Sequence, residues 1–108
     1  MRVVAIATFP VHGKPGVQHP HVQVGRAGLA GDRPKKAAVS LVGTDQSATR
    51  ANLVVDAPTP QLEELDGTSV RIGDVVLAVR LTGTSCPGLY ATVGEEGSIR
   101  VGDVVEPA

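Results

Sequence analysis

The amino-acid sequence predicts an all-β fold, a small closed or nearly closed antiparallel β-barrel with one or two short helices. Eighteen of the 108 residues are valine, which favours the pleated, half-buried surface of a β-sheet. Thirteen glycines and eight prolines indicate many turns between short apolar segments. The length allows one domain, residues 1–108, because there is no room for a second hydrophobic core.

The first part of the chain alternates apolar segments with segments rich in glycine and proline. The run "RVVAIATF" at 2–9 predicts a strand buried on both faces, whereas three prolines at 10–20 favour a loop. A strand is expected at 21–25, where apolar and polar residues alternate. Segment 26–36 is predicted to be irregular, and 37–43 to be a further strand.

Helix is expected only in the middle of the chain. Residues 44–51 suit either a short helix or a loop, and a strand is predicted after them at 52–56. Thr59 is a suitable cap for a helix of one or two turns, because Pro60 would then occupy the first helical position and Gly67 would end it.

The last part of the chain contains a near repeat, "SVRIGDVVLAV" at 69–79 and "SIRVGDVVEP" at 98–107. Each copy places Gly-Asp between apolar residues, which predicts a strand, a turn and a second strand. Asp74 and Asp103 are therefore interpreted as turn residues rather than as a catalytic pair of carboxylates.

Composition restricts the partners and the compartment. A formal net charge of −1 and very few aromatic residues argue against binding of nucleic acid. A single cysteine cannot form an internal disulfide, which favours the reducing cytoplasm. No apolar run approaches the length needed to span a membrane, so no membrane partner is expected.

The lone cysteine, Cys86, lies in "TGTSCPG" at 82–88 among hydroxyl-bearing residues and glycines. Such surroundings suit an accessible and reactive thiol, because structural cysteines usually lie in apolar surroundings. A cysteine hydrolase is a weaker hypothesis, because nothing places a histidine base beside the thiol. The three histidines lie between residues 12 and 21 without the spacing of a known metal site, so exposed histidines are preferred over zinc ligands.

Segment 26–36 carries four of the ten basic residues among glycines. This pattern suits an anion site, because glycine-rich turns expose backbone N–H groups and arginine binds phosphate through two hydrogen bonds. The segment lacks the Gly-Lys-Ser/Thr ending of a Walker motif. A solvated basic loop is the alternative interpretation.

Five features in order resemble the MOSC domain, the family named for the C-terminal domain of molybdenum cofactor sulfurases. The chain is most similar to compact, stand-alone bacterial members, and the resemblance runs from residue 25 to the end. The features are "GLAGDR" at 28–33, "TRANLVV" at 49–55, "LDGTSVRIGDVVLAV" at 65–79, the lone Cys86 and "GSIRVGDVV" at 97–105.

The resemblance implies a β-barrel that binds the molybdenum cofactor (molybdopterin), whose pterin carries a phosphate and a dithiolene. Cys86 matches the cysteine that is proposed in this family to carry sulfur or to ligate molybdenum, and a soft thiolate suits both tasks. The expected partners are a pterin-type cofactor or a protein that donates or accepts sulfur. The alternative is a non-catalytic β-barrel interaction module with an incidental cysteine. The matching motifs and the basic segment assign these residues to the cofactor pocket: Asp32, Arg33, Lys35, Lys36, Arg50 and Asn52.

Overall fold

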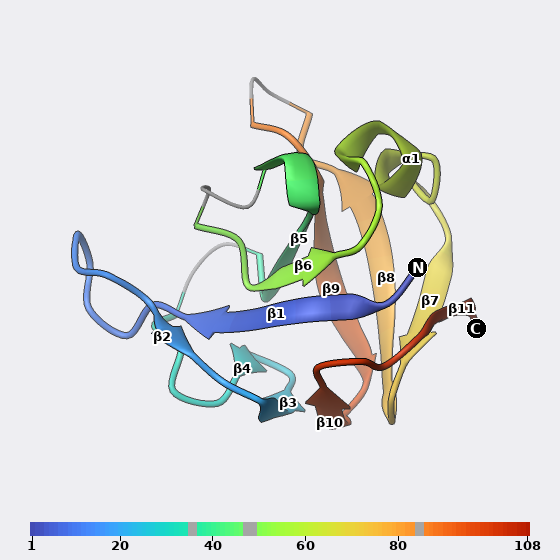
Figure 1. Ribbon diagram of the computed structural model, residues 1–108. Helices are drawn as coiled ribbons and strands as arrows, with labels where there is room; N and C mark the ends of the chain where they lie inside the picture. Colours follow the sequence, from blue (N-terminus) through green and yellow to red (C-terminus); the bar gives the residue numbers. More distant parts are fainter. Residues whose placement is uncertain (35–36, 47–49, 84–85) are drawn as a thin grey trace.

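The computed structural model describes residues 1–34, 37–46, 50–83 and 86–108, and within them the chain is mainly β (Figure 1). The predicted all-β class is therefore confirmed. Helical structure is limited there to a 3₁₀ turn, η1 (Thr44–Gln46), and one short α-helix, α1 (Thr59–Glu63). The strands are β1 (Val3–Thr8), β2 (Val17–Gln18), β3 (His21–Gly25), β4 (Gly28–Leu29), β5 (Val39–Gly43), β6 (Leu53–Val55), β7 (Ser69–Ile72), β8 (Val75–Leu81), β9 (Leu89–Glu95), β10 (Gly97–Arg100) and β11 (Val105–Pro107).

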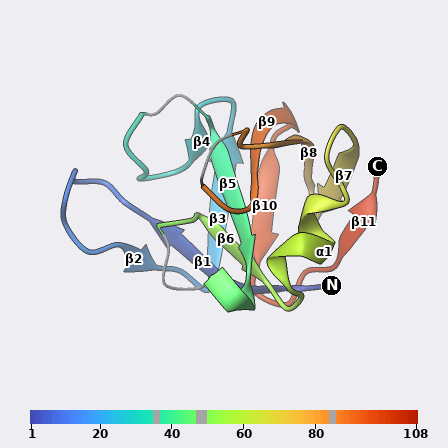
Figure 2. The ribbon, with the colours of Figure 1, turned by 90° about the horizontal axis from the view of Figure 1, so that it is seen from above.

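The strands form two sheets. The larger has the order β11-β7-β8-β9-β5-β6-β1-β2, and the smaller has the order β10-β3-β4. The larger sheet is strongly curled (Figure 2), and buried side chains of the smaller sheet belong to the same hydrophobic core. The two chain termini lie close together at one side of the molecule (Figure 1).

The prediction of a closed antiparallel barrel is wrong in two respects. Among the described strands, β2 and β11 do not pair with each other, so the larger sheet is a curled half-barrel with two edges. Pro15 and Pro20 flank β2 and Pro107 lies in β11, and proline restricts further pairing because it lacks an N–H group. In addition, β5 and β6 are parallel, with Leu41 opposite Leu53.

The core is built almost entirely from valine, leucine and isoleucine, as the composition predicts. The single phenylalanine, Phe9, and the single tyrosine, Tyr90, are only partly buried. Strand β1 is not buried on both faces as expected, because Val4 is 42% exposed at an irregularity in the pairing with β6. Neither of the two aromatic rings belongs to this aliphatic core.

The α-helix begins differently from the prediction. Pro58 occupies the N-cap position without a side-chain hydrogen bond, and Thr59 is a buried residue of the first turn. The Thr59 hydroxyl accepts a hydrogen bond from the Gly43 N–H and donates one to Asp45, so it ties the helix to η1. No helix in the described ranges is long and apolar enough to cross a membrane.

The two Gly-Asp repeats are both turns, but they have different surroundings. Gly73, with φ of 58°, and Asp74 connect β7 and β8 in a two-residue hairpin whose positive first φ is that of a type II′ turn. In the second copy, the chain leaves the smaller sheet after β10 and enters the larger sheet at β11. Asp103 accepts a hydrogen bond from the Arg100 N–H within that turn, which supports a structural role.

Candidate functional site

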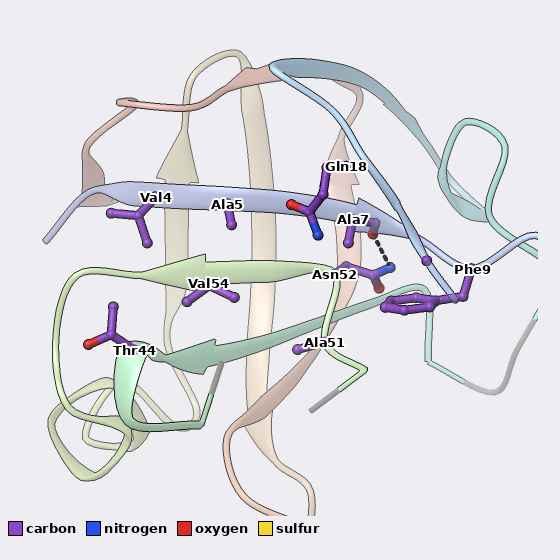
Figure 3. Close-up of a pocket in the computed structure, with 10 residues that line it drawn as sticks. Val4, Ala5, Ala7, Phe9, Gln18, Thr44, Ala51, Asn52 and Val54 are labelled. Atoms are coloured by element: carbon purple, nitrogen blue, oxygen red, sulfur yellow. Dashed lines mark hydrogen bonds between the residues drawn. The ribbon is translucent and has the colours of Figure 1, made fainter. Parts of the chain in front are cut away.

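Asn52 is a fully buried polar residue in the middle of the larger sheet, just before β6. Its side-chain oxygen accepts a hydrogen bond from the Ser40 N–H at 3.1 Å, and its amide nitrogen donates to the Ala7 carbonyl at 3.1 Å (Figure 3). The same nitrogen donates to Asp32 Oδ2 at 3.1 Å. Asn52 therefore joins β5, β1 and the loop after β4.

Asp32 extends this network from the loop to the end of β1. Its Oδ1 accepts a hydrogen bond from the Phe9 N–H at 2.8 Å, while Oδ2 accepts the bond from Asn52. Asp32 and Asn52 were both assigned to the cofactor pocket by the matching motifs. Their hydrogen bonds also give them a structural role, because they fix the backbone around which the neighbouring arginines are placed.

Arg33 and Arg50, the two assigned arginines within the described residues, share a cleft with Phe9 and Asp32. This arginine cleft has a volume of about 120 Å³, and both arginines are exposed. Within the described part of the chain, no carboxylate forms an ion pair with either guanidinium. The hollow thus has two guanidiniums and one carboxylate, that of Asp32, on its lining, and the two guanidiniums suit an anion with several oxygen atoms.

Cys86 is exposed, as its polar surroundings predict. The Thr82 hydroxyl donates a hydrogen bond to the Cys86 carbonyl, and the Gly88 N–H donates to Glu63 Oε2 at 2.9 Å. Gly88 has a φ of 94°, and a Cβ at this position would lie 2.2 Å from the Leu41 carbonyl oxygen. The loop therefore returns to the sheet through a tight contact that requires glycine.

The thiol lies beside a second cleft, of about 270 Å³, on the outer side of β5. This thiol cleft adjoins the arginine cleft because Arg50 lines both. The structure thus brings Cys86 and Arg33 to neighbouring hollows, although they are far apart in the sequence. Residues that line the thiol cleft include Ser40, Arg50, Ala51, Thr82, Cys86 and Pro87.

A third hollow adjoins the other two through Phe9 and Ala51. This groove has a volume of about 280 Å³ and a floor of small apolar side chains on β1 and β6 (Figure 3). Figure 3 shows the Phe9 ring at one end beside Asn52 and the Thr44 side chain at the other. Asn52 borders the groove although its side chain is fully buried.

The other basic residue of segment 26–36 that the structure describes does not line the arginine cleft. The Arg26 guanidinium donates a hydrogen bond to the Val93 carbonyl at 3.1 Å, and the Arg26 backbone N–H donates to the Glu96 carboxylate. Lys35 and Lys36 lie outside the described residues. Of the two basic residues of this segment that the structure describes, Arg33 lies at the cleft and Arg26 does not.

The histidines do not form a metal site within the described residues, where no group of three or more potential ligands is found. His19 is instead placed by a contact of 2.8 Å between its Nε2 and the Thr8 hydroxyl. His12 and His21 are exposed, whereas His19 is partly buried.

Sequence analysis did not single out Phe9, Ser40 or Glu63 as parts of the site. The Arg50 guanidinium lies over the Phe9 ring, and Ser40 forms hydrogen bonds with Asn52. The Glu63 carboxylate accepts a hydrogen bond from the loop that follows Cys86. The only sequence signal for Phe9 was its position as the single phenylalanine of a chain whose core lacks aromatic residues. No sequence pattern around Ser40 or Glu63 indicates that these residues belong to the site.

Comparison with known proteins shows the fold but no family. No family model matches the sequence, and no curated protein is significantly similar to it. A crystal structure described as that of a hypothetical protein has a TM-score of 0.76 at 16% identity, over 99% of this chain and 68% of the other. The crystal structure of the YuaD protein from Bacillus subtilis has a TM-score of 0.74 at 13% identity, over 97% and 93%. At this level of identity, the likeness establishes a shared fold alone.

Proposed function

We propose that this protein binds the molybdenum cofactor and uses Cys86 as the thiol that carries sulfur or ligates molybdenum. One observation carries the proposal: Arg50 lines both the cleft of the exposed thiol and the cleft of Arg33. A phosphate-binding surface and a soft sulfur ligand are therefore neighbours. Under the same proposal, the curled half-barrel is a compact MOSC domain that lies in the cytoplasm. The order of the five sequence features supports the assignment to this family.

The residues present fit the chemistry of this cofactor. Guanidinium groups bind phosphate through paired N–H donors, so Arg33 and Arg50 would hold the pterin phosphate. Thiolate is a soft ligand, so Cys86 would hold the metal or a sulfur atom beside it. When bound, the cofactor supplies a molybdenum centre held by a dithiolene.

The sulfur-carrier form of the proposal requires a persulfide donor, R–S–SH, on a partner protein. The Cys86 thiolate attacks the outer sulfur of the donor, a new S–S bond forms on Cys86, and the S–S bond of the donor breaks. The donor leaves as a thiolate, R–S⁻, and takes up a proton from water. The exchange is neutral in electrons, so it needs no additional oxidant or reductant.

The cofactor is tested by purifying the protein from cells that make molybdopterin and measuring the bound molybdenum and pterin. Arg33→Ala is expected to weaken binding of the pterin phosphate by about 1.5–3 kcal/mol, the range for hydrogen bonds to charged groups. Arg100→Ala is the matched control, because Arg100 is an exposed arginine on the smaller sheet, outside both clefts. Equal affinity for Arg33→Ala and wild type would place the phosphate elsewhere.

The thiol is tested by treating the native protein with a small persulfide and measuring its intact mass. Wild type is expected to gain one sulfur atom, whereas Cys86→Ser gains none and keeps its melting temperature because the side chain is exposed. A thiol that iodoacetamide modifies only after unfolding would contradict the proposal. Failure of both the cofactor and the persulfide tests would favour a non-catalytic interaction module with an incidental cysteine.

A further inference from the structure

We propose that Phe9 is a positioning residue whose ring holds the Arg50 guanidinium at the junction of the two clefts, ready to bind a phosphate group. The inference rests on the proposed function for its choice of anion, and on the geometry for everything else. The guanidinium carbon of Arg50 lies over the Phe9 ring, 4.4 Å from its centre. A cation over an aromatic face is attracted by the negative charge of that face.

The ring also lies close to Gly16, at the end of the loop between β1 and β2. A Cβ on Gly16 would lie 2.4 Å from a carbon of the Phe9 ring, so any larger residue would displace the ring. Gly16 does not have a positive φ, so its backbone conformation does not require glycine. The close approach of the Phe9 ring requires glycine there because it has no side chain. The ring is thus close both to Gly16 and to the Arg50 guanidinium.

The backbone that carries the ring is fixed by the buried network. The Phe9 N–H donates to Asp32 Oδ1, and Asp32 Oδ2 accepts a hydrogen bond from Asn52. Arg50 precedes Asn52 by two residues, with the buried Ala51 between them. The ring and the guanidinium are therefore both attached to the same anchored point of the larger sheet.

The contact with the ring leaves the guanidinium able to bind an anion. A guanidinium carries five N–H donors, which is more than one ring contact can engage. Both carboxylate oxygens of Asp32, the acidic group of this cleft, accept hydrogen bonds from Phe9 and Asn52. An arginine held in this way loses less side-chain freedom when phosphate binds than a solvated arginine does.

The test measures binding of inorganic phosphate through the ¹H–¹⁵N resonance of the Arg50 Nε–Hε group, at constant ionic strength. Phe9→Leu removes the ring, and it is expected to weaken phosphate binding at Arg50 by about 2- to 5-fold, as for the loss of an exposed cation–π contact. Phe9→Tyr keeps the ring and should retain the affinity of wild type. Tyr90→Leu is the matched control, because Tyr90 is the other partly buried aromatic residue and lines neither cleft.

A second ring-free variant, Phe9→Met, covers the case in which Phe9→Leu does not fold, as judged from its backbone amide spectrum. Unchanged affinity in a folded ring-free variant would overturn the inference, and so would the absence of any phosphate-induced shift at Arg50 in wild type. Loss of affinity in Phe9→Tyr would also overturn it. A protein that passes this test but purifies without molybdenum and pterin would refute the proposed cofactor and leave the role of Phe9 intact.

Discussion

Replacing Asn52 with alanine would remove the amide that connects β1, β5 and the Asp32 loop. The side chain is fully buried, and its polar atoms make bonds to Ser40, Ala7 and Asp32. Alanine keeps the backbone of this segment and adds no bulk. The substitution therefore isolates the contribution of the polar network to stability.

The magnitude follows from the partners that lose their bonds. The Ser40 N–H and the Ala7 carbonyl lie within the sheet, where water replaces a lost partner poorly, whereas Asp32 is half-buried and regains water. Stranding a buried polar group costs about 1–3 kcal/mol, so for these two groups we expect a total loss of about 2–6 kcal/mol. At about 4 °C per kcal/mol, the melting temperature should fall by about 8–24 °C.

The assay is urea unfolding followed by far-UV circular dichroism, because the protein has no tryptophan to report unfolding by fluorescence. Gln18→Ala on the neighbouring β2 is the control, since this polar residue is exposed, and it should change the free energy of unfolding by less than about 0.5 kcal/mol. A loss below about 0.5 kcal/mol for Asn52→Ala would refute the reasoning, because it would mean that the network contributes no more than a surface contact.

Three further predictions concern the elements around the site. Gly88→Ala should destabilise the protein more than Gly83→Ala, because both glycines have positive φ but only at Gly88 would a Cβ collide with the backbone; paired urea curves measure the difference, and equal losses would show that strain alone matters. Glu63→Ala should speed hydrogen exchange of the Gly88 amide about tenfold or more, since a bond to a charged acceptor contributes about 1.5–3 kcal/mol, whereas Glu63→Gln keeps an acceptor and should protect the amide; identical exchange in the two variants would contradict the contact. Hydrogen bonds from the Thr59 hydroxyl and N–H lower the pKa of Asp45 from its usual value of 3.8, so the folded state favours the carboxylate. The resulting stability is present above pH 3.8 and is lost as the pH falls through the lower folded pKa; Asp45→Asn should flatten this part of the stability curve, and an unchanged curve would exclude a role for Asp45.

Local sequence patterns determined the class of the fold and several of its turns. Alternation of valine with polar residues predicted strand β3, because each side chain of a strand faces the side opposite to its neighbour. Gly73-Asp74 predicted a hairpin turn because glycine readily takes the positive φ that a two-residue turn requires. The polar, glycine-bounded segment around Cys86 likewise predicted an exposed thiol.

Interactions between distant segments decided the rest. The half-barrel with a parallel pair of strands depends on which edges meet, and Thr59 became an anchor for Asp45 rather than a helix cap because η1 lies beside α1. Sequence could mark Arg33 and Arg50 as basic residues in separate motifs, but not as neighbours around one hollow. Their meeting depends on a buried network and on an aromatic contact, and both form only when β1, β5, β6 and the loop after β4 have already come together.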